Sequence, residues 1–165
     1  MADRREVSAN QTDRPDAGGA VLTLPTVREV MTLDAVVAGV PEVLVGEQAL
    51  EARVRWVHVS DSVSAARLLD GGELLLTTGS GWPSDKAELA SFVAALLGSG
   101  LAGIVIELGA RYVRVPYEVV DSCREHGVAL IVLHRETKFV AITEAVHSRI
   151  ITDQLAALQA RDEVR

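Results

Sequence analysis

Side chains that can bind a small molecule stand at or near the ends of the most apolar segments of this chain. They are His58, Ser60, Asp61, Thr77, Thr78, Gly79, Ser80, Gly81, Glu107, Arg135 and Thr137. Hydroxyl, carboxylate, imidazole and guanidinium groups all occur in this set. An arginine suits a carboxylate, and hydroxyls fix the orientation of a polar ligand. The set predicts a site for a small polar metabolite of the purine, amino-acid or carboxylate class.

Each of these residues also has a structural alternative. Asp61 is a common residue type at a helix N-cap, and His58 on a strand is often a hydrogen-bonded core residue. Thr77 and Thr78 can be ordinary strand residues. Glu107 and Arg135 can pair with each other in a structural ion bridge. The sequence leaves both interpretations open.

The stretch GGELLLTTGSGWPSD, residues 71–85, has the layout of a phosphate-binding turn. A P-loop needs Gly-Lys-Ser/Thr at its end, whereas this loop continues Gly81-Trp82-Pro83. A dinucleotide fingerprint needs a third glycine where Ser84 stands. We therefore expect a strand-to-helix turn that uses glycine torsions. Its free backbone N–H groups would suit a carboxylate or another small polar ligand.

No set of residues for catalysis or metal binding can be assembled. Cys123 is the only cysteine, and with His126 at i+3 it supplies half of a metal site at most. The chain lacks the G-x-S-x-G pattern of a nucleophile elbow. We expect no catalytic residue, no metal and no cofactor, and hence no enzyme.

Apolar periodicity predicts the elements that position these residues. Strands are expected at 42–46, 52–60, 73–78, 102–109 and 128–134, and helices at 26–31, 84–100, 116–127 and from 139 to the end. Continuous apolar strands that alternate with amphipathic helices predict an α/β fold, a mostly parallel sheet with helices on both faces. Carboxyl ends of parallel strands share one edge, so the polar residues should meet there. Strand order stays open, and residues 42–60 can add antiparallel strands at an edge.

The long C-terminal helix has two parts. Phe139, Ile142, Val146 and Ile150 can pack on the domain. Beyond them only a thin apolar stripe continues, made of Ile151, Leu155 and Leu158. A narrow seam on a helix that leaves a domain indicates a homodimer contact or a linker to another part of a longer protein.

Composition excludes several classes of protein. The net charge is −7 and the pI about 5.1, which disfavours binding to nucleic acid by this chain. No apolar stretch is long enough to span a membrane, and no secretion signal is visible. A single cysteine fits the cytoplasm. Residues 1–20 are polar and predict a disordered leader. Both tryptophans, Trp56 and Trp82, are expected in the core.

Four stretches carry a resemblance to a known family. They are TVREVMTL (26–33), VRWVHVSDS (54–62), GGELLLTTGSGW (71–82) and FVAITEAVHSRI (139–150), with GLAGIVIELG (100–109) between the last two. Together they resemble the amino-terminal domain of the purine-catabolism-regulator (PucR-like) family of bacterial transcription factors, over about residues 26–151.

The resemblance implies a ligand-sensing regulatory domain at 21–150, followed by a linker or dimer helix at 151–165. It also implies that DNA is bound only through a downstream helix-turn-helix part, which this sequence does not contain, and that the genes controlled are catabolic. The alternative is a structural dimerisation module of the same regulator without a small-molecule site.

Overall fold

The computed structural model describes residues 24–163, so the predicted leader at 1–20 lies outside the described residues. The strands are β1 Pro41–Val45, β2 Trp56–Val59, β3 Glu73–Thr77, β4 Gly103–Glu107 and β5 Ala129–Leu133. The helices are α2 Val27–Val30, α3 Asp34–Val37, α4 Lys86–Gly98, α5 Tyr117–His126 and α6 Phe139–Glu163, with short 3-10 helices η1 Glu47–Glu51 and η2 Ala65–Leu68.

The strands form one five-stranded sheet in the order β1-β5-β4-β3-β2. β2, β3, β4 and β5 run parallel, and β1 pairs antiparallel with β5 at one edge. Every residue of β3, β4 and β5 is buried, as continuous apolar strands in a helix-covered parallel sheet must be. The predicted α/β fold is confirmed, and the antiparallel edge that the sequence left open is formed by β1.

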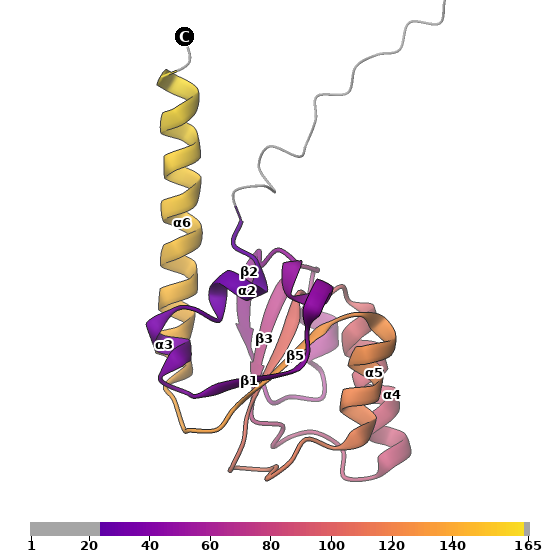
Figure 1. Cartoon of the computed structure of the whole chain (residues 1–165). Helices are drawn as coiled ribbons and strands as arrows, with labels where there is room; N and C mark the ends of the chain where they lie inside the picture. Colours follow the sequence, from indigo (N-terminus) through magenta and orange to yellow (C-terminus); the bar gives the residue numbers. More distant parts are fainter. Residues whose placement is uncertain (1–23, 164–165) are drawn as a thin grey trace, which may run out of the picture.

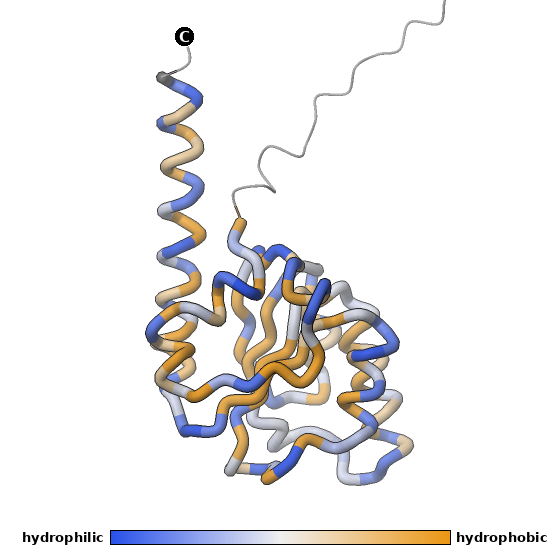
Figure 2. Tube along the Cα trace, in the orientation of Figure 1, coloured by the Kyte–Doolittle hydropathy of each residue, from blue (hydrophilic) through white to orange (hydrophobic). Residues whose placement is uncertain are grey.

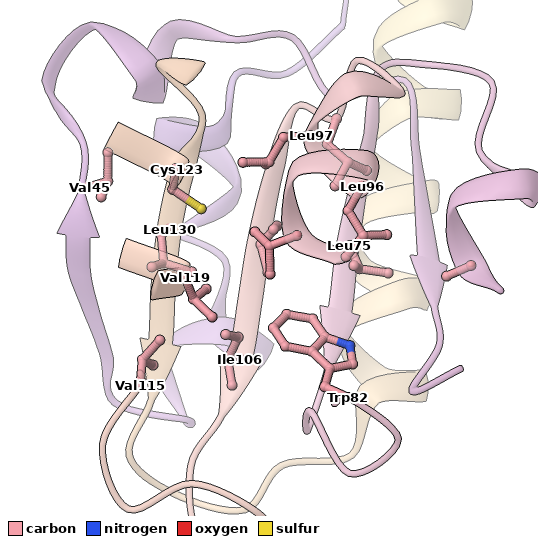
Figure 3. Close-up of a cluster of buried hydrophobic side chains, with 14 of the residues drawn as sticks. Val45, Leu75, Trp82, Leu96, Leu97, Ile106, Val115, Val119, Cys123 and Leu130 are labelled. Atoms are coloured by element: carbon pink, nitrogen blue, oxygen red, sulfur yellow. The ribbon is translucent and has the colours of Figure 1, made fainter. Parts of the chain in front are cut away.

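Helices cover both faces of the sheet (Figure 1). On one face α4 and α5 pack over a core that includes Leu75, Ile104 and Leu130, and Figure 3 shows Trp82 and Cys123 in the same cluster. On the other face α2, α3 and the first half of α6 pack over Leu74, Leu76, Ile131 and their neighbours. Consecutive leucines of β3 therefore serve opposite cores, as the two-residue repeat of a strand requires.

Local signals predicted two helix ends correctly and a third only approximately. The Thr26 hydroxyl accepts a hydrogen bond from the Glu29 backbone N–H at 3.1 Å and starts α2. Gly127, at φ 65°, ends α5 in the left-handed conformation. Helix α4 begins slightly later than predicted, because the Asp85 carboxylate accepts from the Glu88 N–H and makes Asp85 the N-cap.

The second predicted strand needs correction. β2 covers only Trp56–Val59, and Val57 is its most buried residue, whereas the Trp56 side chain is 46% exposed. The expectation that Trp56 lies in the core is wrong. β2 is the last strand of the sheet, so no neighbouring strand lies beyond it to help cover the Trp56 side chain. Trp82 is only 3% exposed, which confirms its core position.

Helix α6 packs on the domain through Ile142, Val146 and Ile150, which are nearly fully buried. Its second half runs on past the sheet and stands clear of the described domain (Figure 1). In that half Ile151, Leu155 and Leu158 are 51%, 54% and 56% exposed. Among residues 24–163 no helix combines the length and apolar character needed to cross a membrane.

Candidate functional site

The carboxyl ends of β2, β3, β4 and β5 lie side by side, so most of the polar residues listed from the sequence follow one edge of the sheet. Within that edge they fall into two hydrogen-bonded groups. One joins Asp61 to the loop after β3, and the other joins Glu107 to Thr137. His58 belongs to neither, since its side chain lines a cleft elsewhere.

Asp61 is the centre of the first group. Its carboxylate accepts from the Thr77 hydroxyl and the Thr78 N–H, each at 2.7 Å, and from the Thr78 hydroxyl at 3.0 Å. Burial opposes ionisation of Asp61, but the hydrogen bonds from Thr77, Thr78 and Gly79 outweigh it and hold the pKa of the carboxyl below its usual value. The residue therefore ties β2 to β3 rather than capping the following helix, whose N-cap Ser64 makes no side-chain cap bond.

The loop 77–82 is closed by its own groups. The Gly79 N–H donates to the Thr77 hydroxyl at 3.1 Å, and the Ser80 N–H to the Thr78 hydroxyl at 3.3 Å. Gly79 has φ 77°, and a Cβ on it would come within 2.4 Å of the Tyr112 ring. The Gly79 and Ser80 N–H groups are thus used inside the loop. A ligand at this turn stays a prediction.

The second group surrounds Glu107, which is 8% exposed. Its carboxylate accepts from the Thr137 backbone N–H at 3.0 Å, so it holds the chain where it enters α6. Arg135 is exposed, and its backbone N–H donates to the Gly39 carbonyl at 3.0 Å. Because Arg135 is exposed, its guanidinium can be reached by a ligand from solvent. Binding of a carboxylate ligand by Arg135 stays a prediction.

A cleft of about 360 Å³ lies beside the edge strand β2. It is lined by Arg55, Trp56, His58, Leu68, Asp70 and Glu73. Glu73 is 6% exposed, and its carboxylate accepts from the Asp70 N–H at 3.0 Å and lies 3.7 Å from the Arg55 guanidinium. An aromatic ring, a cation and carboxylates thus converge on one concave surface.

Sequence reasoning found only His58 of this cleft. The signal that the sequence analysis missed is a group of charged residues at the starts of two strands. Arg55 precedes β2, and Asp70 and Glu73 stand where β3 begins. In a parallel pair the starts of two strands meet as their ends do. Trp56 opposite Glu73 in the register places these groups together.

A second missed residue, His147, joins α6 to β2. Its Nε2 accepts the Val57 backbone N–H at 3.1 Å, and its ring stacks on Trp56 with centroids 3.5 Å apart. Since β2 is an edge strand, this N–H has no neighbouring strand to pair with. The imidazole supplies the missing acceptor. The sequence gave one signal for this contact: His147 directly follows Val146, which packs on the domain.

This contact makes the stability of the domain depend on pH. Burial lowers the pKa of His147, because it disfavours the charged form of the ring. Protonation would also break the hydrogen bond from the Val57 N–H, since a protonated ring has no nitrogen that can accept. The unfolded chain binds the proton at a higher pH than the folded one. Stability should therefore fall as pH drops from about 6.5 toward the lower folded-state pKa.

The test is the melting temperature of the wild type, His147→Gln and His126→Gln between pH 7.5 and pH 5. His147→Gln should lose much of the pH dependence, whereas His126→Gln, at an exposed helix end, should keep it. Equal pH profiles for all three proteins would contradict the role of His147.

Metal and thiol chemistry have little support in the described part of the chain. Residues 24–163 hold no group of three or more His, Cys, Asp or Glu side chains placed to bind a metal ion. Burial raises the pKa of the Cys123 thiol to about 12, which leaves it protonated and unreactive.

The fold and these sites define an α/β domain whose edge strand is fastened to a long protruding helix. Comparison with known proteins identifies the family of this domain. Residues 29–150 match the family described as "Purine catabolism regulatory protein-like family", PucR. The chain belongs to this PucR family, which confirms the resemblance.

One relative is described as "Transcriptional activator PmfR" from Paenarthrobacter nicotinovorans. It is 26% identical over 129 residues, which are 78% of this chain and 27% of that protein. The aligned part therefore spans about a quarter of the relative.

A solved structure, the CBS and DRTGG domains of the regulatory region of Clostridium perfringens pyrophosphatase with diadenosine tetraphosphate, matches with a TM-score of 0.47 and 12% identity. It covers 84% of this chain and 53% of that one. A likeness at this level supports no conclusion about ligand or mechanism.

Proposed function

We propose that this chain is the regulatory region of a bacterial transcription regulator, and that it binds a small polar metabolite and passes its occupancy on through α6. The observation that carries the proposal is the position of Trp56. Its side chain lines the cleft, and its ring stacks on His147 of α6. A ligand that shifts Trp56 therefore changes the surface on which α6 rests.

The physical requirement is differential affinity. A ligand moves α6 only if it binds one arrangement of Trp56 and His147 better than another. The Val57–His147 hydrogen bond and the ring stack hold one arrangement, and both depend on a single helix residue. Because Ile142, Val146 and Ile150 also hold α6 on the domain, the difference in binding energy must be large enough to change that packing as well.

The chemistry of the cleft selects the ligand class. Trp56 offers an aromatic face, Arg55 a cation, and Asp70 a carboxylate at the rim. A purine, an amino acid or another carboxylate can use these groups. The strand-end edge with Arg135 is the second candidate location. We expect DNA to be bound by another part of the regulator, because this chain carries a net charge of −7. The genes controlled would serve catabolism of the ligand, and the protein would act in the cytoplasm.

The test is calorimetry and thermal shift with purines, amino acids and small carboxylates. At a hundred times its dissociation constant a ligand stabilises the folded domain by about 2.7 kcal/mol, which raises the melting temperature by several degrees. Tryptophan fluorescence should change on binding, and this change should disappear in Trp56→Phe.

Matched arginine variants locate the site. Arg55→Ala should weaken binding about tenfold or more, while Arg135→Ala should leave it unchanged. The reverse result would move the site to the strand-end edge. If no compound stabilises the domain, the sensing function is contradicted and the structural dimerisation module is favoured.

A further inference from the structure

A carboxylate is buried at the cleft beside β2. Glu73 is the first residue of β3 and lines this cleft, although only 6% of the residue is exposed. In Figure 2 the strands in the middle of the sheet are mostly hydrophobic, whereas hydrophilic positions lie mainly in the helices and turns. A charged residue inside a buried strand is therefore an exception. It persists only where opposite charge or hydrogen-bond donors compensate it.

Glu73 has few partners of this kind. Its two carboxylate oxygens share the Asp70 backbone N–H, at 3.0 and 3.2 Å. Among residues 24–163, Arg55 is the only cation within 4 Å of this carboxylate, and its guanidinium lies at 3.7 Å, too far for a hydrogen bond. The Arg55 side chain is 56% exposed, so it can turn toward a ligand in the cleft.

The cleft as a whole holds more negative than positive charge. Asp70 is exposed, and within the described residues its carboxylate forms no ion pair. When His58 is neutral, the two carboxylates of Asp70 and Glu73 face one guanidinium, which leaves one excess negative charge. A ligand that carries a positive charge is therefore attracted to this cleft.

A simple carboxylate is poorly suited to this arrangement. Its partner in the cleft would be Arg55. If Arg55 turns to the ligand, Glu73 loses the one cation beside it, and a buried charge without its partner is costly. A simple amine can pair with Glu73, but it then lies close to the Arg55 guanidinium, which repels it. A molecule with both charges avoids both costs, because its carboxylate takes Arg55 while its ammonium group replaces Arg55 beside Glu73.

The rest of the cleft is apolar. Leu68 is 66% exposed and Trp56 is 46% exposed, and both line the concave surface. Stacking on His147 holds the Trp56 ring in place, with the centroids 3.5 Å apart. An apolar or aromatic group of a ligand would cover Leu68 and the exposed part of this ring. The volume of about 360 Å³ is in the range of small-molecule sites.

We propose that the cleft beside β2 binds an α-amino acid with an apolar or aromatic side chain. Its carboxylate binds Arg55, and its ammonium group binds Asp70 and Glu73. Its side chain packs on Trp56 and Leu68. This inference rests on the proposed function, because it names the ligand class of the same cleft. It excludes purines and simple carboxylates as the ligands for which the cleft is built.

Calorimetry with the 165-residue chain tests the ligand class. The probes are the twenty standard L-amino acids, adenine, hypoxanthine and succinate. An apolar or aromatic amino acid should bind, and the same molecule without its amino group, or without its carboxyl group, should bind about tenfold more weakly or less. Tighter binding of a purine or of a simple carboxylate would overturn this inference and leave the proposed function in place. If no probe binds, both fail.

Charge variants locate the two ends of the ligand. Asp70→Asn should weaken binding of the amino acid about tenfold, whereas Asp162→Asn, at an exposed position near the end of α6, should leave it unchanged. Glu73→Gln keeps an oxygen that can accept the Asp70 N–H but removes the buried charge. This variant no longer needs Arg55 as a partner, so it should bind the molecule without the amino group better than the wild type does.

A gain of binding in Glu73→Gln cannot come from a folding defect, and the melting temperature of each variant verifies that it is folded. A Glu73→Gln protein that keeps the full preference for the amino acid would overturn the inference. Equal binding by the wild type and Asp70→Asn would also overturn it.

Discussion

Asp61→Ala is expected to lower the free energy of unfolding by about 3 kcal/mol. The substitution removes the acceptor of three hydrogen bonds and leaves the Thr77 hydroxyl, in a side chain with no exposed surface, and the Thr78 N–H unpaired. An unsatisfied buried donor costs more than a missing bond at the surface. Urea denaturation followed by circular dichroism measures the loss.

Asp85→Ala is the matched control for this prediction. Asp85 also accepts from a backbone N–H, that of Glu88 at 3.1 Å, but at an exposed helix N-cap. It should cost about 1 kcal/mol. A similar cost for both variants would show that Asp61 does not hold buried groups.

The pH dependence of the Asp61 effect has a defined sign. The pKa of Asp61 is lower in the folded protein than its usual value of 3.8. The stabilisation is therefore present above that value and is lost as pH falls through the lower folded-state pKa. The stability difference between wild type and Asp61→Ala should shrink on acidification below about pH 4.

Gly81→Ala is expected to cost about 3 kcal/mol, because a Cβ at this position would lie 2.1 Å from the Asp61 carbonyl oxygen. The atom in its way is backbone, so relief requires the loop and the end of β2 to separate. That movement would also disturb the bonds from Asp61 to Thr77 and Thr78.

Gly98→Ala in α4 is the control for the same chemical change. A Cβ there meets no heavy atom within 4 Å, so the substitution should stabilise the helix by about 0.5 kcal/mol. Opposite signs at the two glycines are the expected result of the denaturation experiment. Unchanged stability of Gly81→Ala would contradict the proposed role of this close approach.

These two predictions concern the loop that looked like a phosphate-binding turn. Its glycines serve two close approaches, Gly79 to the Tyr112 ring and Gly81 to the Asp61 backbone. Its hydroxyls serve a carboxylate of the same chain. The missing lysine and third glycine argued against a nucleotide loop, and that expectation stays a prediction. The sequence offered no way to see that Asp61 accepts from these hydroxyls.

The sequence was informative wherever the determining contacts are local. Thr26 with Glu29 starts α2, Gly127 ends α5, and unbroken apolar runs place β3, β4 and β5. The sequence also predicted that polar residues would follow the ends of these strands, because parallel strands end at a shared edge.

The contacts between distant segments could not be predicted in this way. Alternation along 52–60 does not distinguish an edge strand from a central one, so it predicted Trp56 in the core. In the structure Trp56 is 46% exposed. His147 meets Val57 across 90 residues of sequence, and a helix pattern does not encode which strand edge lies beside it.

The amino-acid sequence by itself thus determined the α/β class, the helix ends, the protruding terminal helix and the membership of the PucR family. Tertiary structure alone decided which groups meet: Asp61 with Thr77, Glu107 with Thr137, and His147 with the edge of β2. The physical reason is that hydrophobic periodicity reports how much of an element is buried. The order of strands in the sheet decides what each element is buried against.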